Sequence, residues 1–220
     1  LGTDEQVMSI LPVSKEKKAK EQYLMLVTEN GTAKKMAYSH FKDVRRSGLI
    51  AIKLDKDDSL KSAKLVEKGD DMMLVTADGQ SIRFKESDIR EMGRTAGGVR
   101  AMKVDKGDSI IGVDVVSKDS STSVLLTMSS NGLGKCTKLT EYKVQKRGGS
   151  GIKTAKVTTK TGKLIVAKVV TDEEELISMS KKGQVIRVEL KSVPRLGRDT
   201  QGVTIMKLRA GDGIASLTCF

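Results

Sequence analysis

The most regular feature of this chain is an apolar run that leads into a short polar turn and recurs about every fifty residues. Four segments share it: "YLMLVTENGTAKK" (23–35), "MMLVTADGQSIRF" (72–84), "VLLTMSSNGLGKC" (124–136) and "LISMSKKGQVIRV" (176–188). The second corner of each turn is a glycine, and the spacings are 48, 53 and 51 residues: Gly31, Gly79, Gly132 and Gly183. Asn-Gly and Asp-Gly pairs favour type I′ turns, whose central residues need positive φ. The pattern therefore predicts four β-hairpins.

The second half of each unit repeats as well. A basic, glycine-containing loop precedes an alternating strand in residues 41–54, 89–104, 142–157 and 193–208. A charged turn and an apolar strand follow: "LKSAKLV" (60–66), "IIGVDVV" (110–116), "LIVAKVV" (164–170) and "GIASLTCF" (213–220). Alternation with period two is typical of half-buried strands, and no window of eleven residues carries a sustained helical stripe. Each unit is therefore predicted to hold four strands.

Four strands in a repeated unit of about fifty residues are typical of a propeller-like toroid. We therefore expect an all-β fold and a single domain over residues 1–220, with repeats at 23–71, 72–123, 124–175 and 176–220. Residues 5–13, "EQVMSILPV", align with the last strand of each unit. We expect them to form an orphan strand of a preceding blade that pairs with a neighbouring unit, because an unpaired apolar edge is an aggregation hazard.

Charge indicates the kind of partner. The 220 residues contain 40 Lys and Arg against 28 Asp and Glu, a net charge of +12. Such an excess favours a polyanionic partner. Aromatic residues make up only 3% of the chain, which argues against stacking platforms for single strands. Duplex nucleic acid is therefore the favoured ligand.

The basic loops recur at one phase of the repeat, and in a toroid an equal phase means an equal radial position. Their cations should therefore trace one arc of the perimeter, suited to bent duplex DNA. Glycines would let the backbone approach phosphates, with little readout of bases. The cations and glycines expected to bind DNA are Arg45, Arg46, Lys53, Arg94, Arg100, Lys103, Lys146, Arg147, Gly148, Gly149, Gly151, Lys153, Arg195 and Arg198. Arg147, Lys146 and Lys153 are expected to contact phosphates from an exposed loop.

Catalytic and metal-binding patterns are not found. The one histidine, His40, and the scattered tyrosines, Tyr23, Tyr38 and Tyr142, are given no catalytic role. Cys136 and Cys219 form neither a disulfide framework nor a zinc-ligand spacing. The acidic stretches "DKDD" (55–58) and "TDEEE" (171–175) are interpreted as solvated turns rather than metal sites. The apolar runs are too short to cross a membrane, so we expect a cytoplasmic protein without a cofactor in this domain.

The segment "QKRGGSG" (145–151) resembles the gyrase A box, Gln-Arg-Arg-Gly-Gly-Lys-Gly, with Lys146 in place of an Arg and Ser150 in place of the Lys. Surrounding phrases such as "RFKESDIREMGRTAGGVRAMKV" and "GRDTQGV" are similar to the C-terminal domain of the bacterial DNA gyrase A protein. The resemblance implies a β-pinwheel whose blades exchange strands and whose basic rim wraps DNA, so that a type II topoisomerase introduces negative supercoils. The family domain usually has six blades, and this chain resembles the last four plus the closing strand of the second.

The resemblance adds Gln145, the first residue of the box, to the residues expected to bind DNA. It also implies partners: double-stranded DNA, the N-terminal part of the gyrase A protein, and the gyrase B protein. ATP and Mg²⁺ would serve the holoenzyme, while this domain alone would not be catalytic. A bacterial, nucleoid-associated location is implied. Two alternatives remain open at this point. The chain could be the C-terminal domain of the corresponding topoisomerase IV protein, which steers substrate choice, or a protein-interaction propeller.

Overall fold

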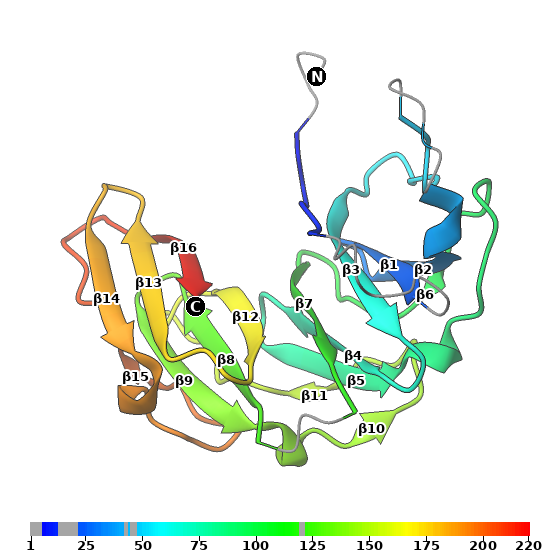
Figure 1. Ribbon diagram of the computed structural model, residues 1–220. Coiled ribbons are helices and arrows are strands. Elements are labelled where there is room, and N and C mark those ends of the chain that lie inside the picture. The colour runs from blue at the N-terminus through cyan, green and yellow to red at the C-terminus, as the bar shows by residue number, and fades with distance from the viewer. Residues whose placement is uncertain (1–5, 13–21, 42–43, 45–47, 119–121) are drawn as a thin grey trace.

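The computed structural model describes residues 6–12, 22–41, 44, 48–118 and 122–220. In this part of the chain the strands form four sheets, and the only helical segments are single 3-10 turns. The sheets follow one another along an open arc, with the first and fourth at its two ends (Figure 1). The all-β, propeller-like fold expected from the repeats is confirmed.

Each unit begins with an antiparallel hairpin: β1 (Gln22–Thr28) with β2 (Thr32–Ala37), β4 (Asp71–Thr76) with β5 (Gln80–Lys85), β8 (Val124–Ser129) with β9 (Leu133–Lys138), and β13 (Glu175–Ser180) with β14 (Val185–Glu189). A 3-10 segment follows each hairpin: η1 (Tyr38–Phe41), η2 (Glu86–Asp88), η3 (Leu139–Glu141) and η4 (Leu190–Ser192). Each unit closes with an apolar strand that pairs with the first strand of the hairpin: β3 (Leu60–Glu67), β7 (Ile110–Val116), β12 (Leu164–Val170) and β16 (Ile214–Cys219).

The remaining strands join the sheet of the preceding unit. β6 (Val99–Arg100) pairs with β2, β10 (Val144–Gln145) and β11 (Ile152–Lys153) pair with β5, and β15 (Val203–Thr204) pairs with β9. The sequence predicted longer alternating strands after the basic loops. In the structure each of these strands pairs with its neighbour over only two residues, so the predicted length is wrong. After β6, the amides of Ala101 and Met102 both donate to the carbonyl of Gly31, so the ladder ends at the neighbouring hairpin turn. This exchange links successive units.

The four hairpin turns lie at the predicted glycines, but the predicted turn type is wrong. Gly31 has a φ of +85°, and no residue type other than glycine has positive φ anywhere in the described residues. The amide of Gly31 donates to the Thr28 carbonyl, and the Thr32 amide donates to the Thr28 hydroxyl. This is a three-residue loop, a type I turn followed by a left-handed glycine, rather than a type I′ turn.

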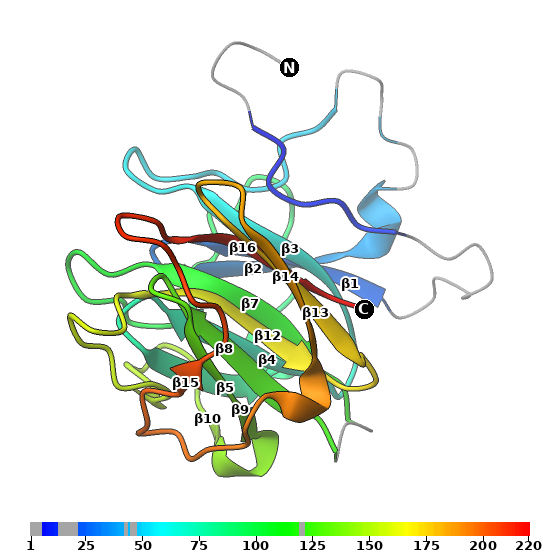
Figure 2. The same cartoon turned by 90° about the vertical axis from the view of Figure 1, so that its left-hand side faces the viewer.

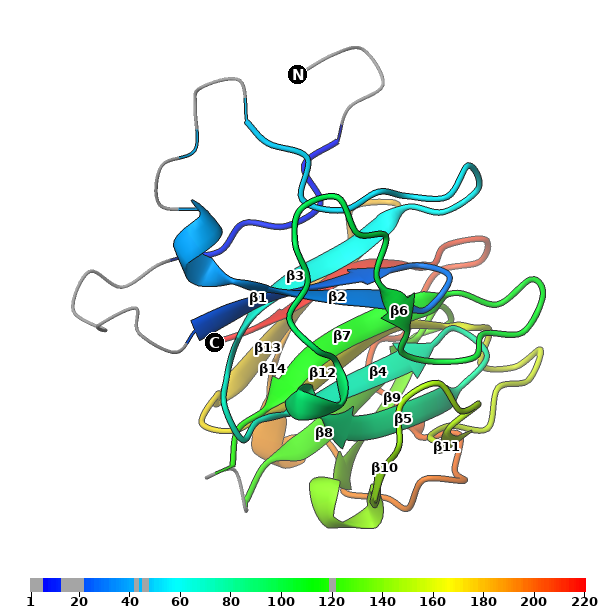
Figure 3. The ribbon, with the colours of Figure 1, turned by 90° about the vertical axis from the view of Figure 1, so that its right-hand side faces the viewer.

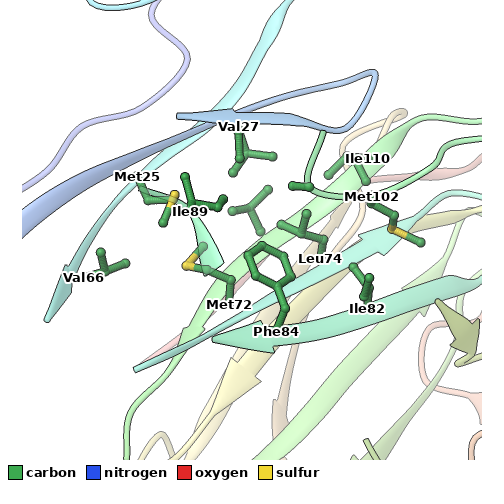
Figure 4. Packing of buried hydrophobic residues seen from close by; sticks show 13 residues of the cluster. Met25, Val27, Val66, Met72, Leu74, Ile82, Phe84, Ile89, Met102 and Ile110 are labelled. Carbon is green, nitrogen blue, oxygen red and sulfur yellow. The ribbon is translucent and has the colours of Figure 1, made fainter. Parts of the chain in front are cut away.

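The core lies between neighbouring sheets. Met25, Met72, Leu74 and Phe84 are fully buried where the first sheet faces the second (Figure 4). The next interface contains Tyr142, whose hydroxyl lies 2.6 Å from the Thr154 hydroxyl. Full burial of one large apolar side chain contributes roughly 1.5–3 kcal/mol. Because aromatic residues are scarce, flexible methionines fill the irregular space between sheets.

The N-terminal segment differs from its prediction. Residues 6–12 form no strand, and all of them except Leu11 are exposed. Two contacts join them to the first unit. The Ser9 hydroxyl donates to the Ala63 carbonyl at 3.2 Å, and Leu11 packs against Leu24, Leu26 and Met36, on the face of the first sheet that points away from the second unit. A strand needs a backbone ladder, and among the described residues 6–12 form no backbone hydrogen bond with the edge strand β3 that Ser9 contacts. The expected strand over 5–13 is therefore wrong across the described residues.

The arrangement gives each unit an inner and an outer side. β3, β7, β12 and β16 lie next to one another along the inside of the arc. The exchanged strands lie at the outer edges of the sheets they join (Figure 1). Viewed from its two ends, the arc also has two faces (Figures 2 and 3). The hairpin turns and the turns before β3, β7, β12 and β16 extend from one face, called here the turn face, and the 3-10 segments lie toward the other.

Candidate nucleic-acid interface

Three of the four basic loops lie within the described residues, at the outer edges of successive sheets. These rim loops are residues 94–98, 147–151 and 198–202. Each precedes an exchanged strand, so the strand pairing fixes where the loop sits. The fourth loop, with Arg45 and Arg46, lies outside the described residues. The rim loops therefore follow the perimeter in chain order.

Arg147 fastens the second rim loop to the unit before it. Its Nε donates to the Asp88 carbonyl at 2.9 Å, and its Nη1 donates to the Arg100 carbonyl at 2.7 Å. The amide of Gly148 also donates, to the Ala101 carbonyl at 2.6 Å. Arg147 itself is half-buried, although Lys146, Gly149 and Ser150 of the same loop are exposed as expected. Two of its donors hold the loop, and the N–H of Gly148 is not available to a phosphate.

The glycine at the end of this loop has a packing role. Gly151 has a φ of +77°, and a Cβ there would lie 2.2 Å from the Ser81 carbonyl oxygen. Only glycine fits this close approach of loop to sheet. Gly149 differs, since its φ is ordinary and a Cβ would meet nothing closer than 3.9 Å. The box-like sequence thus contains both required and tolerant glycines.

The third rim loop is held by a buried lysine. The Nζ atom of Lys135, on β9, lies 2.6 Å from the Gly197 carbonyl and 2.7 Å from the Arg198 carbonyl. It also lies 3.1 Å from the Thr200 hydroxyl. Arg198 in turn donates from Nη1 to the Lys153 carbonyl at 3.0 Å. Arg198 and Arg147 occupy the same position in successive repeats. Each donates a hydrogen bond to a backbone carbonyl of the exchanged strand one unit earlier, Arg147 to β6 and Arg198 to β11.

The first rim loop has the same lysine clamp. Lys34, which is fully buried, donates from Nζ to the carbonyls of Ala51, Arg94 and Ala96 at 2.7–2.8 Å. Lys34 and Lys135 both stand three residues after a hairpin glycine. The corresponding residue in the second unit is Ile82, and there Arg147 fastens the loop instead. Two different devices therefore hold the rim loops.

Burial changes the ionisation of these groups. Desolvation lowers the pKa of Lys34, and it lowers the pKa of Lys135 to about 8. Burial also raises the pKa of the Cys136 thiol to about 11, so this cysteine is not a reactive thiolate. Between the first two units, Lys35 and Glu86 form a buried ion pair at 2.5 Å.

The remaining predicted cations of the described residues are exposed to solvent. Among the described residues, seven of the predicted basic side chains are exposed: Lys53, Arg94, Arg100, Lys103, Lys146, Lys153 and Arg195. Lys146 lies 3.4 Å from Asp88 yet keeps 92% of its side chain exposed. The others form no ion pair within the described ranges. Gln145 is half-buried in β10, where its backbone pairs with Phe84.

Sequence reasoning missed three lysines. Lys34 and Lys135 lie in hairpins, where a lysine is ordinarily an exposed residue, so only their recurrence after the glycine could have singled them out. Lys156 is exposed at the repeat position of Lys103 and was overlooked. Its amide donates to the Thr200 carbonyl at 3.1 Å, as the Lys103 amide does to Gly149 at 2.9 Å. The phase of the repeat is the signal that identifies it.

Other chemistry is sparse in the described residues. They contain no group of three His, Cys, Asp or Glu side chains that could hold a metal ion. No helix among them is long and apolar enough to cross a membrane. A cleft of about 590 Å³ opens between the third and fourth units, lined by Cys136, Glu174, Glu189 and Arg195 among others. Its carboxylates would repel a phosphate.

Strand-exchanged sheets around an arc, with basic loops locked along the outer edge, define a β-pinwheel of the propeller class. The family described as "DNA gyrase C-terminal domain, beta-propeller" matches residues 22–67, 70–117, 123–171 and 174–220. The chain belongs to this family.

Individual relatives agree with the family match. The chain is 38% identical over 213 residues to the DNA gyrase A protein of Staphylococcus epidermidis (strain ATCC 12228 / FDA PCI 1200), covering 97% of this chain and 23% of that protein. A structure of the DNA gyrase A C-terminal domain matches with a TM-score of 0.80 at 29% identity, over 91% of this chain and 66% of that one. The C-terminal domain of DNA topoisomerase IV matches with a TM-score of 0.88 at 22% identity, over 100% of this chain and 67% of that one. The last likeness shows the fold alone.

Proposed function

We propose that this chain binds duplex DNA along its outer rim and bends it around the arc, as the non-catalytic wrapping module of a gyrase-type topoisomerase. The observation that carries the proposal is the locked series of rim loops. Each loop is hydrogen-bonded to the preceding unit, so the exposed cations keep a fixed spacing around a curve. A fixed curved line of cations favours a bent polyanion over a straight one.

The charge chemistry supports phosphate contact rather than base readout. Exposed lysines and arginines without ion pairs can neutralise phosphates and release counterions, which contributes binding free energy without sequence preference. Two of the arginines, Arg147 and Arg198, give part of their donor capacity to backbone carbonyls. They therefore place the loops, while exposed cations such as Lys103 and Lys153 face the duplex.

Supercoiling activity belongs, in this proposal, to the enzyme that contains this domain. The relatives at 35–38% identity are gyrase A proteins, and the chain spans 23% of their length. The gyrase B protein and the remainder of the gyrase A protein would supply ATP and Mg²⁺ chemistry. The topoisomerase IV alternative has support from fold alone, and a protein-interaction propeller would not need phased cations.

The experiment compares two charge-matched double variants. Lys103→Gln/Lys153→Gln removes two rim cations. Lys68→Gln/Lys118→Gln removes two exposed lysines from the turns that follow the inner strands β3 and β7. Affinity for a duplex is measured across a range of salt concentrations. The rim variant should reduce the slope of log affinity against log salt by about 1.8, since each phosphate contact contributes about 0.9.

The control variant should leave the slope unchanged. Equal slopes for both variants would contradict a rim site. Wrapping is measured separately, by relaxing a closed circular duplex with a type I topoisomerase in the presence of the chain. A change in linking number that disappears with the rim variant supports wrapping, whereas binding without any linking change would limit the proposal to DNA binding.

A further inference from the structure

The turns on the turn face are paired within each unit. The amide of Asn30 donates to the Asp58 carboxylate at 3.0 Å, and the amide of Asp78 donates to the Asp108 carboxylate at 2.9 Å. In the fourth unit the Lys182 amide donates to Asp212 at 3.1 Å. The hairpin turn and the turn before the inner strand are therefore held together, and Figures 2 and 3 show all of them at one face of the arc.

The charge on this face changes sign along the arc. In the first two units these turns carry seven carboxylates against two exposed lysines, Lys56 and Lys106. Two of the carboxylates are ion-paired, Glu29 with Lys61 at 3.7 Å and Asp78 with Lys163 at 3.1 Å. The other five are Asp55, Asp57, Asp58, Asp105 and Asp108. The third and fourth units present four cations, called here the basic turn surface: Lys160, Lys181, Lys182 and Arg209. Arg209 stands at the repeat position of Asp55 and Asp105, and Lys181-Lys182 replaces Glu29-Asn30. The framework is shared by the units, so the charge difference is not required by the turns.

The basic turn surface is open to solvent. Its four residues are exposed, and none forms an ion pair within the described part of the chain. Lys182 donates from Nζ to the Ala210 carbonyl at 3.1 Å, which keeps its charge beside Arg209. Asp212 is the nearby carboxylate, and it accepts the amides of Lys182 and Gly213. Lys163 is excluded, because it pairs with Asp78 at 3.1 Å.

We infer that the basic turn surface is a second duplex-binding surface. It receives DNA that leaves the rim at the third and fourth units, while the acidic turns of the first two units hold the duplex off the same face. This rests on the proposed function. Cations at one end and carboxylates at the other incline the duplex relative to the plane of the arc, since like charges repel and opposite charges attract along its phosphates. An inclined path gives the wrapped duplex one fixed hand.

The test uses three double variants on a duplex long enough to leave the rim, roughly 40 base pairs. Lys181→Gln/Arg209→Gln removes half of the basic turn surface. Lys56→Gln/Lys106→Gln is the matched control, since these exposed lysines lie at the same face among the acidic turns. Lys103→Gln/Lys153→Gln tests the rim. The first variant should reduce the salt slope by about 1.8, and the control should not change it.

The outcomes separate the two proposals. A reduced slope for the rim variant together with an unchanged slope for Lys181→Gln/Arg209→Gln overturns the second surface and leaves the rim site standing. Unchanged slopes for both overturn both. An equal reduction for the control and the Lys181→Gln/Arg209→Gln variant would mean that any lysine on this face has the same effect, and would also overturn the inference. On a duplex of about 12 base pairs confined to the rim, the turn-surface effect should disappear.

Discussion

The ammonium nitrogen of Lys135 lies 2.6 Å from the carbonyl oxygen of Gly197, a residue of the following unit. Lys135 is 1% exposed, so a charged side chain in one unit is buried in order to hold a surface loop of the next. The lysine is therefore expected to act on DNA binding indirectly, as a positioning residue.

Replacing Lys135 by Met should loosen the loop at 197–202. The carbonyls of Gly197 and Arg198 then lose their hydrogen-bond donor. If the lost bonds lower the free energy of local opening by about 1.4 kcal/mol, amide exchange in the loop becomes roughly tenfold faster. Hydrogen exchange measures this directly. Lys156→Met removes the same charge from an exposed position and should leave exchange unchanged. Equal protection in both variants would show that the strand pairing alone fixes the loop.

The lowered pKa of Lys135 predicts a pH dependence of stability. The folded protein releases this proton near pH 8, while the unfolded chain keeps it up to about 10.5. The unfolded state therefore binds more protons between these values, and the free energy of unfolding should rise with pH across that window relative to Lys135→Met. Denaturant unfolding at about pH 7, 8, 9 and 10 measures it. A constant difference would mean that the carbonyl contacts keep Lys135 protonated.

Arg147→Lys keeps the charge but loses the planar fork that reaches Asp88 and Arg100. It should lower the free energy of unfolding by about 1–2 kcal/mol, because a lysine cannot make both bonds in the same geometry. Arg94→Lys is the control, since Arg94 stands at the same repeat position but is exposed, and its loop is held by Lys34. A similar melting temperature for wild type and Arg147→Lys would contradict the fastening role.

Gly151→Ala and Gly149→Ala distinguish the glycines of the box-like loop. At Gly151 the positive φ and the 2.2 Å approach to the Ser81 carbonyl should together cost about 2–4 kcal/mol. At Gly149 the added Cβ would meet no atom closer than 3.9 Å, so the same change should be close to neutral. Thermal unfolding of both variants checks the difference, and equal effects would refute the packing argument.

The repeat made much of the fold predictable. Apolar runs ending at a glycine every fifty residues or so encode hairpins whose positions depend on local chemistry, and the structure has them at Gly31, Gly79, Gly132 and Gly183. The turn type was not predictable from the Asn-Gly pair, because the same pair fits a two-residue or a three-residue loop. The register of the flanking strands decides between them.

By itself the sequence determined the hairpins, the all-β class and the phase of the basic loops, since these follow from periodicity and from glycine at turns. Only the tertiary structure decided which cations are free. Lys135 and Lys103 are both lysines in repeated segments, yet one is buried against carbonyls of the next unit and the other is exposed. The difference arises from strand exchange, which places a loop from one unit over the hairpin of another. Such contacts join residues about sixty positions apart in the sequence. A local sequence pattern spans far fewer residues, so it cannot predict these contacts.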